Sequence, residues 1–267
     1  MSHSLLDKLG RARSLFRAGG PRALREWRRL RALPRHVAGT TTILGTPIRF
    51  TDAASFLSAY EEIFLHEIYG FAPSRRAPRI IDCGANIGLA VLYWKRRWPD
   101  ARVIAFEPDP AAYAALLSNC AVFGHHDVEA VCKAVWTAHG PLAFVREGAD
   151  AGRLGCVRAE KGNCTVEGYR LRDALGGGPV DLLKLDIEGA EVDVVADCAG
   201  RLDAVEHIFV EFHSFLGTEQ RLDELWQHLR AAGFRLHVQA TYASPRPFVL
   251  RPSSEGMDLR LNVFGWR

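Results

Sequence analysis

The sequence predicts an α/β fold in which a mostly parallel, seven-stranded sheet carries helices on both faces. From residue 79 onward, short apolar runs of strand length alternate with longer segments of helical periodicity, a pattern typical of parallel sheets with crossover helices. Clusters of glycine and proline separate these segments. The composition, with 48% apolar and 24% charged residues, is that of a packed globular chain and excludes a disordered or collagen-like protein.

The chain is expected to divide into a helical N-terminal extension with its connecting region, residues 1–78, and a core domain, residues 79–267. Pro73 and Pro78 mark the boundary between them. Within the first part, the apolar pattern is helical in 5–16 and 24–33, strand-like in 41–50 and helical again in 56–68.

In the core domain, strands and helices are expected to follow one another in turn. The expected strands cover residues 79–83, 102–106, 128–132, 180–186, 205–212, 234–240 and 259–265. The expected helices run from the glycine turn after the first strand to residue 98, from residue 110, from residue 189 and over 218–232. Residues 140–178 are glycine-rich and predict a hairpin and loop, and the last strand is expected at an edge of the sheet.

The net charge of +3 is the average of two unlike parts. Residues 1–36 contain ten basic and two acidic residues, whereas the rest of the chain contains 24 basic and 29 acidic ones. A basic arm therefore precedes a mildly acidic body, and the two need separate explanations.

Cysteine usage and hydropathy indicate the compartment. The six cysteines are scattered through apolar segments and form no C-x-x-C pair, as is typical of free thiols in a reducing compartment. No apolar run reaches the roughly 18 residues of a membrane helix, and the N-terminus lacks a secretory signal. We expect a cytoplasmic protein, with peripheral contact at the inner membrane surface as a variant of that expectation.

The strongest chemical signal follows the first core strand, in Asp82-Cys-Gly-Ala-Asn-Ile-Gly88. Glycine permits the positive φ of a tight turn and the close approach of backbone to a ligand. Glu107 ends the next strand nineteen residues after Gly88, where an acid can hydrogen-bond a ribose diol. The two features predict a cofactor that contains a nucleoside.

The glycine spacing differs from that of a pyrophosphate-binding loop. The pattern is Asp-x-Gly-x-x-x-Gly and not Gly-x-Gly-x-x-Gly. Asp82 would repel a diphosphate, but its carboxylate can accept a hydrogen bond from an ammonium group. This favours S-adenosylmethionine over NAD.

Four motifs carry a resemblance to a known family. They are Asp82-Cys-Gly-Ala-Asn-Ile-Gly88, Phe106-Glu-Pro-Asp109, Asp181-Leu-Leu-Lys-Leu-Asp-Ile-Glu-Gly-Ala-Glu191 and Val210-Glu-Phe-His213. Over residues 79–213 the sequence resembles the FkbM family of S-adenosylmethionine-dependent methyltransferases, whereas residues 1–36 lie outside the resemblance. The resemblance implies a Rossmann-like class I methyltransferase sheet with a final antiparallel strand. It also implies O-methylation, often of sugars or of natural-product hydroxyls.

The glycine turn and the resemblance together give an expected set of cofactor-binding residues. The set is Asp82, Gly84, Ala85, Asn86, Gly88, Glu107, Pro108, Ala134 and Asp186. Asp186 is expected at the end of the fourth strand, beside the sulfonium, because open α/β sheets bind ligands at the carboxyl ends of their strands. Lys184 alternates with Asp186 along that strand and is expected to pair with a nearby carboxylate.

The expected catalytic residues are His213, Asp186, Glu211 and Glu188. His213 is the candidate general base, since a neutral imidazole can accept the proton of a hydroxyl at pH 7. Glu211 lies on the same face of the strand and can orient His213, or it can hold a divalent metal such as magnesium together with Asp186. Only one acid ends this strand, so the metal stays an open alternative. Glu191 is expected in the first turn of the following helix.

The basic arm, residues 1–36, has three interpretations. As an arginine-rich amphipathic helix it can lie on an anionic membrane surface, which would suit an enzyme that methylates a lipid-linked glycan. Its Leu and Trp stripe can instead dock on the core domain or on a partner subunit of a homo-oligomer. A transit peptide is the third. Nucleic-acid binding is not expected, because the body is acidic and contains no groove-reading motif.

The predicted function is therefore O-methylation of a hydroxyl, with a sugar in a surface glycan or glycolipid as the preferred acceptor. A hydroxyl of a polyketide or another secondary metabolite is the alternative. An NAD-dependent oxidoreductase and a non-catalytic cofactor-binding protein remain as alternatives from other classes.

Overall fold

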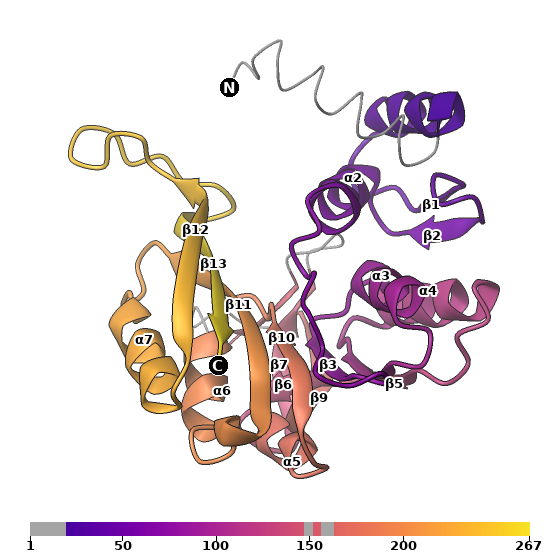
Figure 1. The fold of residues 1–267 in the computed structure, drawn as a ribbon. Helices are drawn as coiled ribbons and strands as arrows, with labels where there is room; N and C mark the ends of the chain where they lie inside the picture. Colours follow the sequence, from indigo (N-terminus) through magenta and orange to yellow (C-terminus); the bar gives the residue numbers. More distant parts are fainter. Residues whose placement is uncertain (1–19, 147–151, 156–162) are drawn as a thin grey trace.

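The structure is a computed structural model, which describes residues 20–146, 152–155 and 163–267. Its centre is a seven-stranded sheet with helices on both faces (Figure 1), as the sequence predicts. In order across the sheet, the strands are β12 (Arg235–Ala243), β13 (Met257–Trp266), β11 (Val205–Phe215), β10 (Val180–Leu185), β3 (Arg79–Cys83), β4 (Arg102–Phe106) and β5 (Glu129–Val131). The strands from β11 to β5 are parallel, and β13 is antiparallel to both of its neighbours.

The last strand is not at the edge of the sheet, so that prediction is wrong. β13 pairs with β11 on one side and with β12 on the other. Leu261 and Val263 of β13 are buried, whereas most residues of β12 are exposed or half-buried. The more polar strand therefore occupies the edge, where unpaired backbone groups face water.

Helices cover the two faces of the sheet and divide the core into two clusters. They are α3 (Leu89–Arg97), α4 (Pro110–Val122), α5 (Leu171–Leu175), α6 (Glu191–Asp197), η3 (Leu202–Ala204) and α7 (Leu222–Ala231). Ile80 belongs to the cluster that contains Trp94 of α3, and its neighbour Ile81 to the cluster that contains Leu229 of α7. Successive residues of a strand point to opposite faces, so one apolar run supplies both cores.

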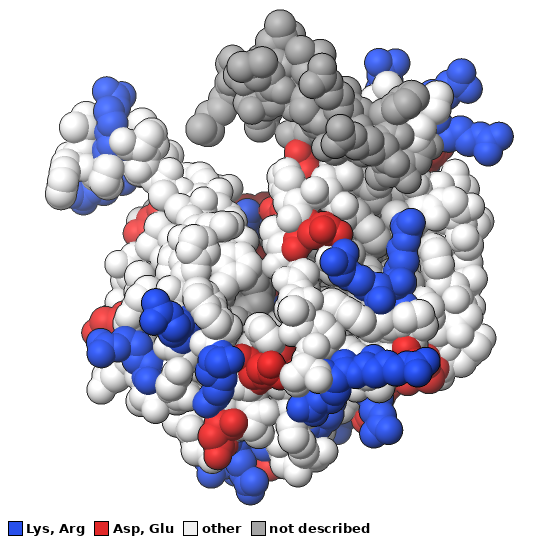
Figure 2. Space-filling model, viewed as in Figure 1, with Lys and Arg blue, Asp and Glu red and all other residues white. Residues whose placement is uncertain are grey.

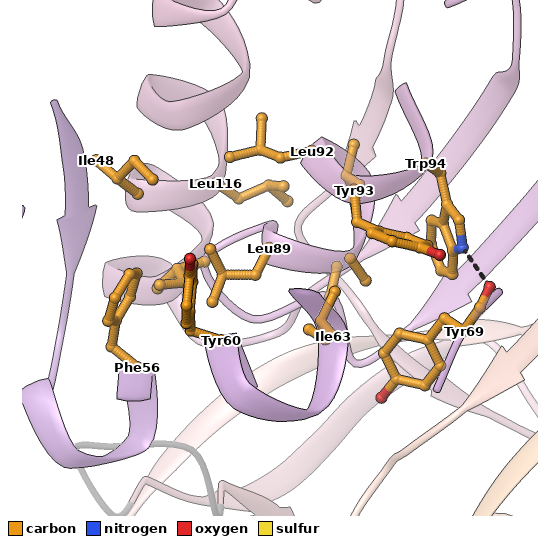
Figure 3. Packing of buried hydrophobic residues seen from close by; sticks show 14 of the residues in the cluster. Ile48, Phe56, Tyr60, Ile63, Tyr69, Leu89, Leu92, Tyr93, Trp94 and Leu116 are labelled. Carbon is orange, nitrogen blue, oxygen red and sulfur yellow. Dashed lines mark hydrogen bonds between the residues drawn. The ribbon is translucent and has the colours of Figure 1, made fainter. Parts of the chain in front are cut away.

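The region before the sheet packs as part of the first cluster. It contains the hairpin β1 (Gly39–Thr41) and β2 (Ile48–Phe50), α2 (Ala53–Tyr60) and a π-helical turn, η1 (Glu61–Leu65). The predicted strand over 41–50 is thus two short strands, and the predicted helix over 56–68 begins earlier and ends earlier. Phe56, Tyr60 and Ile63 pack near Leu89 and Leu116 (Figure 3). The boundary at residue 78 stays a prediction.

Part of the basic arm is also described. Residues 20–31 are helical, and Ala23, Trp27 and Leu30 are buried, with the Trp27 ring 6.2 Å from that of Tyr60. This burial favours docking of the apolar stripe on the body of the protein. The first helical pattern, 5–16, lies outside the described residues. Within the described part, no helix combines the length and apolarity needed to cross a membrane.

The predicted hairpin in 140–178 is part of a second, smaller sheet. Its strand order is β6 (Ala134–Trp136), β9 (Cys164–Arg170), β7 (Gly140–Val145) and β8 (Arg153–Leu154). β7 and β9 are antiparallel, and β6 runs parallel to β9. Phe144 and Leu154 of this sheet are buried beside the carboxyl ends of the large sheet's strands.

Candidate active site

A cavity of about 220 Å³ lies at the carboxyl edge of the large sheet. Residues from β4, β10 and β11 form its floor, α2 and η1 contribute one wall, and Phe144 and Leu154 contribute another. Of the residues predicted from the sequence, nine line the cavity: Gly84, Ala85, Asn86, Glu107, Pro108, Ala134, Asp186, Glu188 and Glu211. Asp82, Gly88 and His213 are not among the lining residues and lie behind them.

The glycine turn after β3 brings bare backbone to the cavity. Gly84 has a φ of 84°, and its N–H donates to Phe106 at 3.0 Å, which fixes the turn against β4. A Cβ at Gly84 would lie 1.9 Å from the carbonyl oxygen of Asp186, so only glycine fits between the two strand ends. Asn86 also has a positive φ, and its buried Oδ1 has no hydrogen-bond partner within the described residues.

Glu107 sits at the end of β4 with its carboxylate held by backbone amides. Its Oε2 accepts from the N–H of Asn86 and its Oε1 from the N–H of Asp109, both at 2.8 Å. Burial raises the pKa of Glu107 to about 7, and the two amide hydrogen bonds oppose that rise. The side chain is thus fixed in orientation and retains lone pairs for a further donor in the cavity.

Lys184 lies between the carboxyl ends of β3 and β10. Its Nζ lies 3.1 Å from Asp82 and 3.4 Å from Asp186, and it donates to the carbonyl oxygen of Gly84 at 2.7 Å. The predicted pairing of Lys184 with a nearby carboxylate is therefore observed. Burial disfavours the charge on Lys184, but the nearby Asp82, Tyr69 and Asp186 outweigh it and raise its pKa well above the usual value. Asp82 is fully buried and faces Lys184.

Glu211 and Asp186 are the acids that face the cavity from β11 and from the end of β10. Glu211 also lies 3.1 Å from Arg260 of β13. Burial and the nearby charge of Asp186 raise the pKa of Glu211 to about 8, although His213 and Arg260 oppose the shift. A carboxylate with such a pKa can accept a proton near neutral pH.

His213 is enclosed by two glutamates. Its Nδ1 lies 3.0 Å from Glu191 and its Nε2 lies 3.7 Å from Glu188. Burial disfavours the imidazolium, but the two carboxylates outweigh it and hold the pKa of His213 well above its usual value. Glu191 in turn accepts from the N–H of Gly189 at 3.0 Å. The raised pKa favours the imidazolium form, and His213 connects β11 to the loop after β10 through Glu188 and Glu191. The sequence analysis expects His213 to act as a neutral base, and that role stays a prediction.

The two predicted metal ligands, Asp186 and Glu211, lie close together and next to His213, and each of the three side chains has a charged partner. One ligand atom each of Asp186, Glu211 and His213 lies within 4.8 Å of the others. However, Asp186 faces Lys184, Glu211 faces Arg260, and His213 faces Glu191. Two cations beside the carboxylates oppose the binding of a third. The arrangement does not fit a divalent metal, and no step is assigned to one.

Several cavity residues were not predicted from the sequence. Tyr69 is buried and lines the cavity, and its ring centroid is 5.7 Å from Lys184 Nζ. Glu62 of η1 lies near enough to raise the pKa of Glu211. Arg260 comes from the last strand. A π-helical turn beside a cavity is a common feature of functional sites, but no local pattern marks it in the sequence.

The sequence is also similar to those of known proteins. The family model described as the methyltransferase FkbM domain matches residues 82–236. Over 205 residues, the chain is 29% identical to "Methyltransferase 1" of Beauveria bassiana, covering 67% of this chain and 81% of that protein. It is 33% identical over 176 residues to "Methyltransferase sdnD" of Sordaria araneosa, covering 51% of this chain and 66% of that one. It is 28% identical over 174 residues to "2-O-methyltransferase NoeI" of Sinorhizobium fredii, covering 58% and 69%.

Proposed function

Since this chain belongs to the FkbM methyltransferase family, we propose that it transfers a methyl group from S-adenosylmethionine to a hydroxyl, preferably of a sugar in a glycan or glycolipid. The observation that carries the proposal is the cavity at the strand ends. There the glycine turn, Glu107, Asp186 and Glu211 all line one space, with Gly84 packed against the backbone of Asp186. An acidic surface of this kind suits a cationic cofactor.

The residues present fit S-adenosylmethionine. Glu107 is a fixed, buried acceptor at the position where a ribose diol is bound in doubly wound sheets. The orphaned Oδ1 of Asn86 offers a second acceptor, and Ala134 and Pro108 provide an apolar surface for a base. When bound, the cofactor supplies a methyl group activated by its sulfonium. The protein contributes orientation of the acceptor, exclusion of water and removal of the hydroxyl proton.

Cofactor binding is the first test. We expect S-adenosylhomocysteine to bind the full chain measurably in isothermal titration calorimetry, and NAD to show no heat of binding. The fixed Glu107 carboxylate can serve a ribose in either ligand, but the acids beside the cavity repel a diphosphate. Binding of NAD without binding of S-adenosylhomocysteine would sink the proposal and favour the oxidoreductase alternative.

We assign proton removal to Glu211, with Asp186 beside it and His213 as a positioning residue. Glu211 faces the cavity, whereas His213 does not line it. In the imidazolium form that the two glutamates favour, both ring nitrogens of His213 carry a proton and neither can accept another. In the proposed reaction, the acceptor hydroxyl loses its proton to the Glu211 carboxylate as its oxygen bonds to the methyl carbon.

A pH profile tests this assignment. The pKa of Glu211 is raised from its ordinary 4.5 to about 8, so the ionised, base-competent form is scarce at pH 6 and grows as pH rises through 8. We expect kcat/KM to climb over that range and level off above it. Glu211→Gln should lower kcat by about 10²–10⁴-fold and remove the climb. Glu224→Gln, at a half-buried pair with Arg221 outside the cavity, is the control. An unchanged pH profile in Glu211→Gln would refute the assignment.

Observations on the cavity wall support each of two classes of acceptor, a sugar and a secondary-metabolite hydroxyl. Thr51, Ser55 and Ser58 add hydroxyls to the cavity wall, which favours a polyhydroxylated acceptor such as a sugar, and one relative is named a 2-O-methyltransferase. Phe144 and Ile63 give other parts of the wall an apolar character, which favours a secondary-metabolite hydroxyl. Transfer of a labelled methyl group to sugars or to aromatic and polyketide alcohols would separate the two.

A further inference from the structure

The connection between β12 and β13 carries the most exposed apolar side chains of the described residues. Phe248 is 95% exposed, Val249 78% and Leu250 46%. These three consecutive residues, the hairpin tip, project from the body of the protein on the loop at the upper left of Figure 1. A cluster of this kind is costly in water and is characteristic of an interaction site.

Arginines flank the hairpin tip on both sides. Arg246 and Arg251 are exposed, and the segment 244–254 contains no acidic residue. Neither arginine forms an ion pair within the parts of the chain that the structure describes, although Arg251 Nε donates to the carbonyl oxygen of Pro247 at 3.1 Å. Figure 2 shows basic side chains on the same projecting lobe. The tip thus presents apolar groups surrounded by uncompensated positive charge.

The tip is a formed turn. The N–H groups of Val249 and Leu250 donate to the carbonyl oxygen of Arg246 at 2.9 and 2.8 Å, and the Ser244 hydroxyl donates to the carbonyl oxygen of Leu250. Pro245, Pro247 and Pro252 restrict the backbone further. Because the turn is already ordered, the hairpin tip loses little conformational entropy when it binds to another surface.

The hairpin tip lies at the same edge of the sheet as the cavity. β13 is antiparallel to β11 and to β12, so β12 runs parallel to β11 and its carboxyl end lies at the cavity edge. At the base of the hairpin, Arg260 pairs in register with Tyr242 and reaches Glu211 in the cavity wall. When the hairpin tip binds a surface, that surface therefore lies on the same side of the protein as the cavity.

We propose that the hairpin tip inserts its apolar side chains into an anionic lipid surface, with Arg246 and Arg251 at the lipid headgroups. Apolar side chains bordered by arginines suit this interface, where burial and attraction to anionic lipids act together. A second copy of the chain fits less well. Three side chains bury far less than the roughly 800 Å² per partner of a stable dimer. It would also bring four arginines together.

The position of the tip extends the proposed function. If the enzyme is an O-methyltransferase, its acceptor is a hydroxyl compound held at a bilayer, such as a lipid-linked molecule. This extension rests on the proposed function, whereas lipid binding by the tip does not. The two can therefore fail separately.

Sedimentation with vesicles tests the tip directly. We expect the full chain to bind vesicles of equimolar phosphatidylcholine and phosphatidylglycerol, to bind pure phosphatidylcholine weakly, and to dissociate as salt is raised. The double variant Phe248→Ser/Val249→Ser should lower the partition coefficient at least about tenfold. Arg246→Ala/Arg251→Ala should lower the preference for the anionic vesicles. Leu117→Ser/Val122→Ser removes two exposed apolar side chains from α4 and should bind as the unchanged protein does.

Two further measurements keep the outcomes distinct. Far-UV circular dichroism of the tip variant reports whether it is folded, and titration with S-adenosylhomocysteine reports whether the proposed cofactor binds at all. Light scattering after size exclusion reports whether the tip variant changes oligomeric state. Vesicle binding that is equal in the tip variant and the unchanged protein would overturn the proposal. So would a dimer that the tip substitutions convert into a monomer, which would make a second copy the occupant.

Discussion

Replacing Gly84 by alanine should abolish cofactor binding. It should also lower the free energy of unfolding by more than the strain energy of a positive φ accounts for. The new Cβ would lie 1.9 Å from the carbonyl oxygen of Asp186, an atom of the backbone that cannot rotate away. The turn after β3 and the end of β10 must then separate, and residues of both line the cavity. The positive φ of 84° adds about 1–2 kcal/mol of strain for a residue with a side chain.

Gly124→Ala is the matched control for this substitution. Gly124 also has a positive φ, 76°, but a Cβ there would meet nothing within 4 Å, and the residue does not line the cavity. We expect it to lose only the strain energy and to bind S-adenosylhomocysteine with unchanged affinity. Calorimetric titration and chemical denaturation measure both variants. Equal behaviour of the two would mean that the close approach of Gly84 to Asp186 does not shape the site.

Lys184→Met should lower the free energy of unfolding by about 3–5 kcal/mol. Lys184 is the cation that faces Asp82, whose side chain is completely buried, and the substitution leaves that carboxylate without a counter-charge. Burial already raises the pKa of Asp82, and loss of Lys184 would raise it further. Urea denaturation with linear extrapolation measures the change. The double variant Lys184→Met/Asp82→Asn should recover part of the loss, because it removes the buried charge as well.

Lys95→Met is the comparison for a buried lysine outside the site. Lys95 is equally buried and lies 2.7 Å from Asp127, but the Asp127 side chain is 64% exposed and remains solvated when the lysine is removed. The loss should be about 1–2 kcal/mol, from the backbone carbonyls that Lys95 no longer satisfies. If both lysine variants lost the same stability, the argument from the burial of Asp82 would be wrong.

The sequence predicted much of the fold because the relevant signals are local. Ile80 and Ile81 stand in an apolar run of strand length, followed by a glycine turn and a helix, and this order recurs along the core domain. The final antiparallel strand was also expected, whereas its place inside the sheet was not. Which of β12 and β13 forms the edge depends on which of them pairs with β11, and β11 lies in a different part of the sequence.

The candidate site also combines features that local sequence signals predict with features that depend on packing between distant segments. That Asp82, Glu107 and Asp186 lie at or next to strand ends could be read from the sequence, since a strand end is a local property. Glu211 was also expected at a strand end, but β11 continues to Phe215. Which of these acids faces the cavity was decided by the register between strands. Lys184 of β10 stands directly opposite Asp82 of β3, so their charges compensate each other and Asp82 is turned away from the cavity.

The sequence by itself thus determined the alternation of strands and helices, the glycine turn and the acids near the carboxyl ends of the strands. Only the tertiary structure decided that Tyr69 and Glu62 from the N-terminal region complete the cavity and that His213 is held between two glutamates. It also decided that an arginine-flanked apolar turn projects from the same edge. The physical reason is that periodicity and turn chemistry act over a few neighbouring residues. Charge compensation, burial and pKa depend on groups that packing brings together from distant parts of the chain.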